Sequence, residues 1–296
     1  MGVTRRGFVV GYDASPGAVV ALDWATEEAR RRGEPLLVLH AVEPVAVPIA
    51  PNPLPAPPVV AGPGPALVDE AVARATRHLD EGQVSGRVVR ASAAAGLVDA
   101  SRHAVTVVTG CRGRSRLASG LLGSVSYAVT AHAHCPAVVV RGEDRSHPDP
   151  EHRVVVGVDG SPTSQRAVQH AAAVAAGAGA PLHVVGVGSI TSPESWAYVE
   201  TSAAGNEHTH GAVSELGPAL DRAAELARAA HPGLAVETEI LFGPAGRVLA
   251  QLGAHAGLLV AGSRGHGGFA GLLLGSVSHR LVHEAAGAVM VVHADD

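Results

Sequence analysis

A six-residue phrase occurs twice in this chain of 296 residues, as Leu121–Ser126 and as Leu273–Ser278. In each copy the phrase ends a glycine frame, in which two glycines three positions apart are followed by nine residues and then Gly-Ser. The frame glycines are Gly110, Gly113 and Gly123 in the first half and Gly262, Gly265 and Gly275 in the second. Each frame follows an apolar strand-like run and precedes a helix-like run. This duplication predicts two similar domains in tandem.

The runs between the frames alternate strand-like and helix-like patterns in both halves. Residues 8–13 and 154–159 each form an apolar run that ends in an acid, Asp13 or Asp159, and a Ser-Pro helix start follows each acid. The first helix is predicted to end at Gly33. Apolar strands alternating with helices predict an α/β fold with two open, doubly wound, five-stranded parallel sheets. Ligands of such sheets bind at the carboxyl ends of the strands, beside the switch point.

The remaining boundaries follow from the same patterns. The first domain is predicted over residues 1–143, a linker over 144–151 and the second domain over 152–296. Further helices are expected at 66–81 and 212–230, with third strands near 86–91 and 234–241. Two long irregular stretches, 44–65 with its many prolines and 189–211, are either functional lids or tolerated surface insertions.

The glycine frame has the composition of a phosphate-binding loop. Glycine lets backbone amides approach a phosphate closely, and a helix N-terminus points unpaired amides at it. Ser124 and Ser126, with Ser276 and Ser278 in the second half, are expected to add hydroxyl donors, and Arg112 and Arg264 to add cationic contacts. The alternative is a helix cap after a glycine turn with nothing bound.

Composition excludes several classes of function. All 22 cationic residues are arginine, so the chain has no lysine for a Walker-A loop, a Schiff base or protein-kinase chemistry of the usual kind. The net charge of −5 gives no field for nucleic acid, and no apolar run is long enough to span a membrane. Two cysteines are too few for a disulfide framework, which favours a cytoplasmic location.

Other motifs are weaker. Gly265-x-Gly267-x-x-Ala270 fits a loose dinucleotide pattern, but it follows the fourth strand of its half rather than the first. The 17 histidines lack the spacing of a zinc site, and no Gly-x-Ser-x-Gly elbow provides a hydrolase nucleophile. We expect the histidines to lie on polar faces or in loops.

The whole chain resembles a tandem universal stress protein, because both halves match the Gly-x2-Gly-x9-Gly-Ser/Thr motif of the nucleotide-binding members and both place an aspartate after the first strand. The resemblance implies an adenine nucleotide α-hydrolase-like fold with strand order 3-2-1-4-5, ATP as ligand, and Mg²⁺ with the phosphates near Asp13 and Asp159. It implies these nucleotide contacts: Gly11, Asp13, Ala41, Val42, Gly110, Arg112, Gly113, Gly123, Ser124, Val125 and Ser126, then Gly157, Asp159, Val187, Gly262, Arg264, Gly265, Gly275, Ser276, Val277 and Ser278.

The resemblance also has a local departure. The second half keeps Gly243-Pro244 before its third helix, whereas the first half has Ser92–Gly96 there, so the wall of the first site is expected to differ.

Three functions stay open from the sequence. The first is an ATP-binding stress-response regulator, expected as a homodimer with an unidentified protein partner, whose occupancy changes its conformation or contacts. The second is a slow ATPase or an autophosphorylating enzyme, with at most weak hydrolysis. The third is a nucleotide-free interaction scaffold.

Overall fold

The computed structural model describes residues 7–43, 64–111, 122–141, 147–188, 207–265 and 273–294. The first half contains β1 (Phe8–Gly11), α1 (Pro16–Arg32), β2 (Leu36–Ala41), α2 (Gly64–Ala75), β3 (Val84–Val89), α3 (Ala93–Ser101), β4 (Thr106–Gly110), α4 (Ser124–His132) and β5 (Ala137–Val140), with a short 3-10 turn at Glu81–Gln83. The second half contains β6 (Val154–Val158), α5 (Pro162–Ala178), β7 (Leu182–Gly188), α7 (Glu207–Ala230), β8 (Val236–Phe242), α8 (Ala245–Gly253), β9 (Leu258–Gly262), α9 (Ser276–Glu284) and β10 (Val289–Val292).

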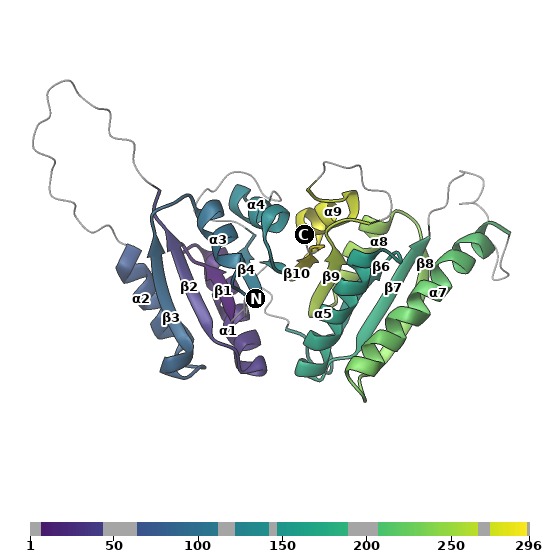
Figure 1. The fold of residues 1–296 in the computed structure, drawn as a ribbon, viewed down its shortest axis with the longest axis horizontal. Coiled ribbons are helices and arrows are strands. Elements are labelled where there is room, and N and C mark those ends of the chain that lie inside the picture. Colours follow the sequence, from purple (N-terminus) through teal and green to yellow (C-terminus); the bar gives the residue numbers. More distant parts are fainter. Residues whose placement is uncertain are drawn as a thin grey trace, which may run out of the picture.

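Each half is a doubly wound parallel sheet, as predicted. The strands run β3-β2-β1-β4-β5 in the first half and β8-β7-β6-β9-β10 in the second, which is the order 3-2-1-4-5 in both. Neighbouring strands within each half are parallel. Helices cover both faces of each sheet, with α3 and α4 opposite α1 and α2 in the first half (Figure 1).

The two sheets join into one sheet of ten strands, a connection that the sequence analysis did not predict. β5 pairs with β10 in antiparallel register, with Ala137 opposite Val291 and Val139 opposite Val289. All four residues of each strand are buried. The antiparallel pairing relates the halves by a pseudo-twofold axis and places the start of one last strand beside the end of the other.

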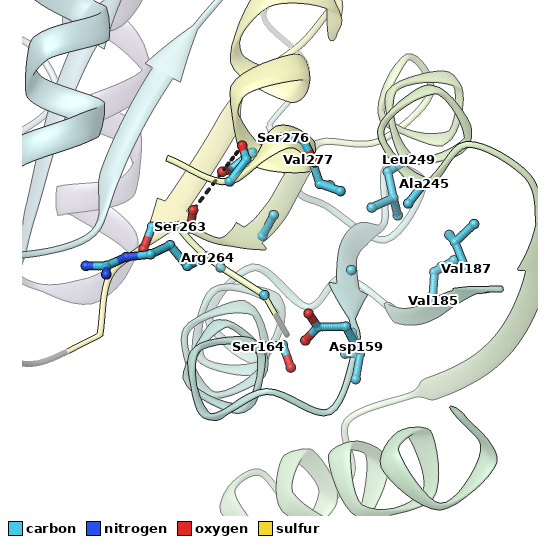
Figure 2. Close-up of a pocket in the computed structure, with 17 residues that line it drawn as sticks. Asp159, Ser164, Val185, Val187, Ala245, Leu249, Ser263, Arg264, Ser276 and Val277 are labelled. Atoms are coloured by element: carbon cyan, nitrogen blue, oxygen red, sulfur yellow. Dashed lines mark hydrogen bonds between the residues drawn. The ribbon is translucent and has the colours of Figure 1, made fainter. Parts of the chain in front are cut away.

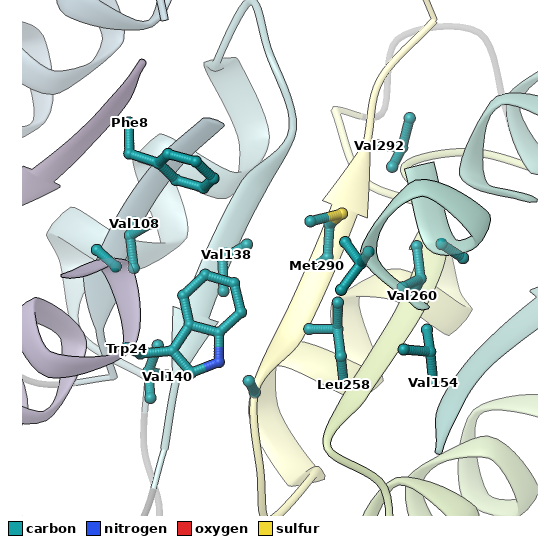
Figure 3. Close-up of a cluster of buried hydrophobic side chains, with 14 of the residues drawn as sticks. Phe8, Trp24, Val108, Val138, Val140, Val154, Leu258, Val260, Met290 and Val292 are labelled. Carbon is teal, nitrogen blue, oxygen red and sulfur yellow. The ribbon is translucent and has the colours of Figure 1, made fainter. Parts of the chain in front are cut away.

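The core continues across this junction. One buried cluster runs from Phe8 and Trp24 through Val138 to Met290 and Val260, so β5 and β10 lie in its middle (Figure 3). On the opposite face of the sheet, Ala131 and Val139 of the first half pack in the same buried cluster as Leu281 of the second. Burial of apolar surface therefore stabilises the contact between the halves as well as each half.

Both long first helices begin, and α1 ends, as the sequence predicts. Ser15 caps α1 by accepting a hydrogen bond from the amide of Ala18 at 3.3 Å, and Ser161 caps α5 in the same way from Ser164 at 3.1 Å. Gly33 ends α1 with φ at 64°, where a residue without Cβ is favoured.

Some other predicted boundaries differ from the structure. The helix expected over 66–81 ends at Ala75, because residues 76–79 form turns and the 3-10 segment follows. The third strands occupy 84–89 and 236–242. Residues 44–63 and 189–206, which hold most of the two irregular stretches, lie outside the described residues.

Candidate functional site

Each half has a cavity at the carboxyl ends of its strands. The second cavity has a volume of about 520 Å³ and the first about 240 Å³. In the second half the lining comes from the ends of β6, β7 and β9, the starts of α5, α8 and α9, and the glycine frame (Figure 2). The switch point of a doubly wound sheet lies between its first and fourth strands, here β6 and β9, so the cavity is where this fold binds ligands.

The structure brings every predicted residue of the second half together. All of the following line this cavity: Gly157, Asp159, Val187, Gly262, Arg264, Gly265, Gly275, Ser276, Val277 and Ser278. Arg264 differs from the expectation in one respect. Figure 2 shows its side chain directed away from Asp159, so the guanidinium does not face the middle of the cavity.

The first cavity gathers most of its predicted set. Its lining includes Gly11, Asp13, Ala41, Gly110, Gly123, Ser124, Val125 and Ser126. Val42 is not among these lining residues: its amide donates to the carbonyl of Val89 at 2.8 Å and its side chain is 41% exposed. The strand therefore uses the amide of Val42 for pairing with β3. Arg112 and Gly113 lie outside the described residues.

A carboxylate is fixed at the floor of each cavity. The Asp159 Oδ1 atom accepts a hydrogen bond from the amide of Ser161 at 3.0 Å, and Asp13 accepts one from Ser15 at the same distance. These bonds tie each acid to the start of the following helix. A Cβ built on Gly265 would lie 2.1 Å from Asp159 Oδ2, so the second glycine of the frame is what allows the acid to stand there.

The glycine frame closes through the same backbone bonds in both halves. The amides of Gly123 and Gly275 donate to the carbonyls of Cys111 and Ser263 at 2.8 and 2.7 Å. A Cβ on Gly110 would lie 2.4 Å from the backbone of Gly17, so this glycine permits close packing of the loop on α1. Cys111 and Ser263 therefore take part in closing their frames through their backbone carbonyls and not through their side chains.

The helices after the frames begin without a side-chain cap. Gly123 and Gly275 occupy the N-cap positions of α4 and α9, and neither can supply a side-chain acceptor. Within the described part of the chain no side chain caps these first amides, and the positive end of the helix dipole faces the cavity, an arrangement that favours an anion.

Two of the predicted hydroxyl donors have another role in this structure. Ser126 Oγ donates to the carbonyl of Gly110 at 2.6 Å, and Ser278 Oγ donates to that of Ser263 at 2.9 Å. Both side chains are buried. Because these protons hold the loop against its helix, Ser124 and Ser276 are the hydroxyls left at the two helix starts.

The structure adds lining residues that the sequence analysis missed. They correspond pairwise between the halves: Tyr12, Ala18, Leu39, Ala93, Leu97 and Thr109 in the first match Val158, Ser164, Val185, Ala245, Leu249 and Ala261 in the second. The sequence held a signal for these residues, because the two members of each pair occupy equivalent positions in the two halves.

The two cavities differ in their side chains beside the second strand. Tyr12 and His40 line the first cavity, where the second half has Val158 and Gly186, and His40 Nδ1 bonds to the carbonyl of Tyr12 at 2.7 Å. Burial, and then the negative charge of Glu70, raises the pKa of Tyr12 above its usual value, so the phenol stays neutral.

The described residues contain no group of three or more His, Cys, Asp or Glu side chains placed to hold a metal ion. A metal at either cavity would need oxygen atoms from a ligand beside the single aspartate, as Mg²⁺ has when it binds with phosphates.

Each frame helix also contacts the opposite half. Arg141 Nη2 donates to the carbonyl of Val282 in α9 at 2.5 Å, and His293 Nε2 bonds to the carbonyl of Thr130 in α4 at 2.8 Å. These two bonds occupy equivalent positions about the pseudo-twofold axis. Tyr127 of α4 contacts the ring of His279 of α9, with centroids 5.9 Å apart. The helix whose N-terminus faces one cavity is thus held at its other end by the other half.

The sequence profile described as the universal stress protein family matches residues 4–141 and again 151–293. The chain belongs to the universal stress protein family. As a tandem universal stress protein it is 34% identical over 297 residues to Universal stress protein Rv2623 of Mycobacterium tuberculosis (strain ATCC 25618 / H37Rv), with 98% of this chain and 97% of that protein covered. It is also 33% identical over 293 residues to Universal stress protein Rv2005c of the same organism, with 97% of each covered.

Solved structures agree on the fold of this universal stress protein. A universal stress protein from Archaeoglobus fulgidus superimposes with a TM-score of 0.63 at 20% identity and covers 99% of this chain and 98% of its own. Among the helices that the structure describes, none is both long and apolar enough to cross a bilayer.

Proposed function

We propose that this chain is an ATP-binding regulatory protein with one nucleotide site in each half and Mg²⁺ bound together with the phosphates. The observation that carries the proposal is the repetition of one site: at each switch point a fixed aspartate faces a glycine frame and an uncapped helix start. Several unpaired amides that converge on one point bind an anion most strongly. A carboxylate beside them can accept a hydrogen bond from a ribose hydroxyl or bind a phosphate-bound cation.

The size of the second cavity supports a mononucleotide. Its 520 Å³ falls within the range of roughly 300–1,000 Å³ that is usual for small-molecule sites, whereas the 240 Å³ of the first falls below it. Valine and leucine side chains at 185, 187 and 249 form an apolar wall at the end away from the frame, which suits a base. We therefore expect the second site to bind ATP more tightly than the first.

Occupancy acts on the protein through α4 and α9. An anion at the N-terminus of either helix favours the helix position that aims its amides at the phosphates, and the other end of that helix is bonded to the opposite half. The bound and empty states thus differ in the contact between the halves. This is the means by which occupancy changes the surface presented to a partner.

Efficient catalysis is not expected from these sites. The chain has no lysine, and Asp13 and Asp159 are the only predicted site residues that could act as a base. Slow phosphate release that persists after both aspartates are replaced by alanine would exclude a catalytic role for them.

Isothermal titration calorimetry with MgATP tests the proposal. The full chain is expected to bind two equivalents, and Asp13→Ala and Asp159→Ala are each expected to remove or weaken one. Asp69→Ala, at an exposed position on α2, is the matched control and should leave both sites intact. Absence of binding by the full chain, or unchanged binding by both site variants, would refute the nucleotide proposal.

A further inference from the structure

Two histidines lie side by side on α9, where this helix meets α4 of the opposite half (Figure 1). His279 and His283 are one helical turn apart, and their ring centroids lie 4.5 Å apart with the ring planes tilted by 33°. Residues four apart on a helix share one face. His279 is exposed and His283 is half-buried, so solvent reaches the pair.

The two rings are held by ring contacts. Tyr127 of α4 contacts both, with its centroid 5.9 Å from that of His279 and 6.3 Å from that of His283. In the part of the chain that the structure describes, neither imidazole has a hydrogen-bond partner. A neutral imidazole carries one nitrogen lone pair, so each ring has an acceptor that no described residue uses. The carboxylate of Glu284 partly offsets the positive charge that Arg141 brings near His283.

The spacing of the rings fits two nitrogens bound side by side to one metal ion. A metal-bound imidazole nitrogen lies about 2.0 Å from its ion, which puts the ring centroid about 3.2 Å from the ion. Two such rings have centroids about 4.5 Å apart at a right angle and about 5.2 Å apart at the tetrahedral angle. The observed 4.5 Å equals the right-angle value. Chelation therefore needs the rings to turn about their own bonds and needs no shift of α9.

The histidine pair is not a product of the duplication. Helices α4 and α9 start at Ser124 and Ser276, so Tyr127 and Ala131 stand where α9 has the two histidines. The equivalent helix of the first half therefore cannot form the same pair. One chain has one such position, on α9 at its contact with α4.

We propose that His279 and His283 bind one late first-row divalent cation, with Cu²⁺ preferred, beside the contact between the halves. Imidazole nitrogens suit copper, nickel and zinc, and of these ions copper binds most tightly and favours right angles between its ligands. Mg²⁺ prefers oxygen ligands and is not expected here. Water completes the coordination, because the described residues offer no group of three His, Cys, Asp or Glu side chains. The site needs no bound nucleotide, so it stands independently of the function proposed above.

Titration of the full chain with Cu²⁺ against a competing chromophoric chelator tests the site, at about pH 7.5 where an ordinary imidazole is neutral. His279→Gln and His283→Gln are each expected to weaken the tightest copper site at least about tenfold, because the remaining imidazole loses a second ligand held at high effective concentration. Electron paramagnetic resonance should show two nitrogen ligands in the parent and fewer in either variant. The matched control, His78→Gln with His103→Gln, removes two exposed histidines of the first half and should bind copper as the parent does.

Other histidines of the chain can also bind copper, and further variants separate them from this pair. His208→Gln with His210→Gln removes another close pair in the sequence and should leave the tightest site unchanged. No copper binding by the parent chain overturns the proposal, and so does an affinity that both α9 variants leave unchanged or that a control variant lowers equally. Asp13→Ala with Asp159→Ala should lose MgATP and keep copper, so failure of the nucleotide sites and failure of this site give different results.

Discussion

Gly265→Ala tests whether the second glycine of the frame exists to make room for Asp159. The new Cβ would lie 2.1 Å from Asp159 Oδ2, and ordinary contact begins at 3.4 Å, so the carboxylate must move by about 1.3 Å. A shift of that size in the short Asp159 side chain strains the 3.0 Å bond from the amide of Ser161 to the other carboxylate oxygen, Oδ1. A hydrogen bond to a charged group contributes about 1.5–3 kcal/mol, and each 1.4 kcal/mol is a factor of ten. We expect MgATP affinity at the second site to fall at least about tenfold.

Calorimetry of a double-mutant cycle measures this effect. In the parent chain Gly265→Ala should weaken the second site, and in an Asp159→Ala background it should add almost nothing, because the residue through which it acts is gone. Gly177→Ala is the matched control. Gly177 lies within α5, and beyond the backbone of its own helix no atom lies within 4 Å of the Cβ that the substitution would add. It should leave binding unchanged and make the helix slightly more stable.

Two results would refute the reasoning on Gly265. One is an unchanged affinity in the Gly265→Ala variant, which would mean that the acid relaxes at no cost. The other is an equal loss in the presence and absence of Asp159. That result would place the effect in the loop backbone and not in the collision with the carboxylate.

Two further predictions concern the contact between the halves and its response to pH. Arg141→Ala removes the bond to Val282 and should weaken any cooperativity between the two MgATP sites while each still binds, although the His293 bond to Thr130 remains. Cooperativity that is unchanged in a calorimetric titration would exclude the route through Arg141. Burial, and then the charge of Arg31, lowers the pKa of His147 below its ordinary 6.5, so the unfolded chain takes up the proton first and stability is lost as pH falls through about 6.5. His147→Gln should therefore reduce the fall in the urea unfolding midpoint between about pH 7 and pH 5. The part of the fall due to His283 and His293 should remain, because their pKa values are lowered in the same direction. A midpoint that falls as steeply with pH in the variant as in the parent would show that His147 does not cause this loss of stability.

Much of the site follows from the repeat alone. Strands that end in an acid, serine caps with proline after them, and a glycine frame before a helix are local signals, and each is set by a few neighbouring residues. They locate Asp159, Gly265 and Ser276 in one cavity, because parallel strands all end at the same edge of a sheet. The position of Val42 after a strand says nothing about whether pairing with β3 uses its amide, and the structure shows that it does.

The serines of the frame show where local reasoning stops. Ser126 and Ser278 have the sequence position of phosphate donors, yet their hydroxyls bond to carbonyls of the loop. That choice depends on how closely the loop packs on its helix, which the order of residues does not fix.

The sequence by itself determined two copies of one α/β domain, the starts of its long first helices and the frame that faces each cavity, because these depend on hydrophobic period, capping and backbone freedom over short distances. Tertiary structure alone decided that β5 pairs with β10 and that Arg166, His134 and His293 meet in one cleft. The sequences of β5 and β10 are mostly buried valine and do not indicate which strand pairs with them, since backbone pairing is nearly independent of side-chain identity. That cleft exists only because the pairing brings distant residues together.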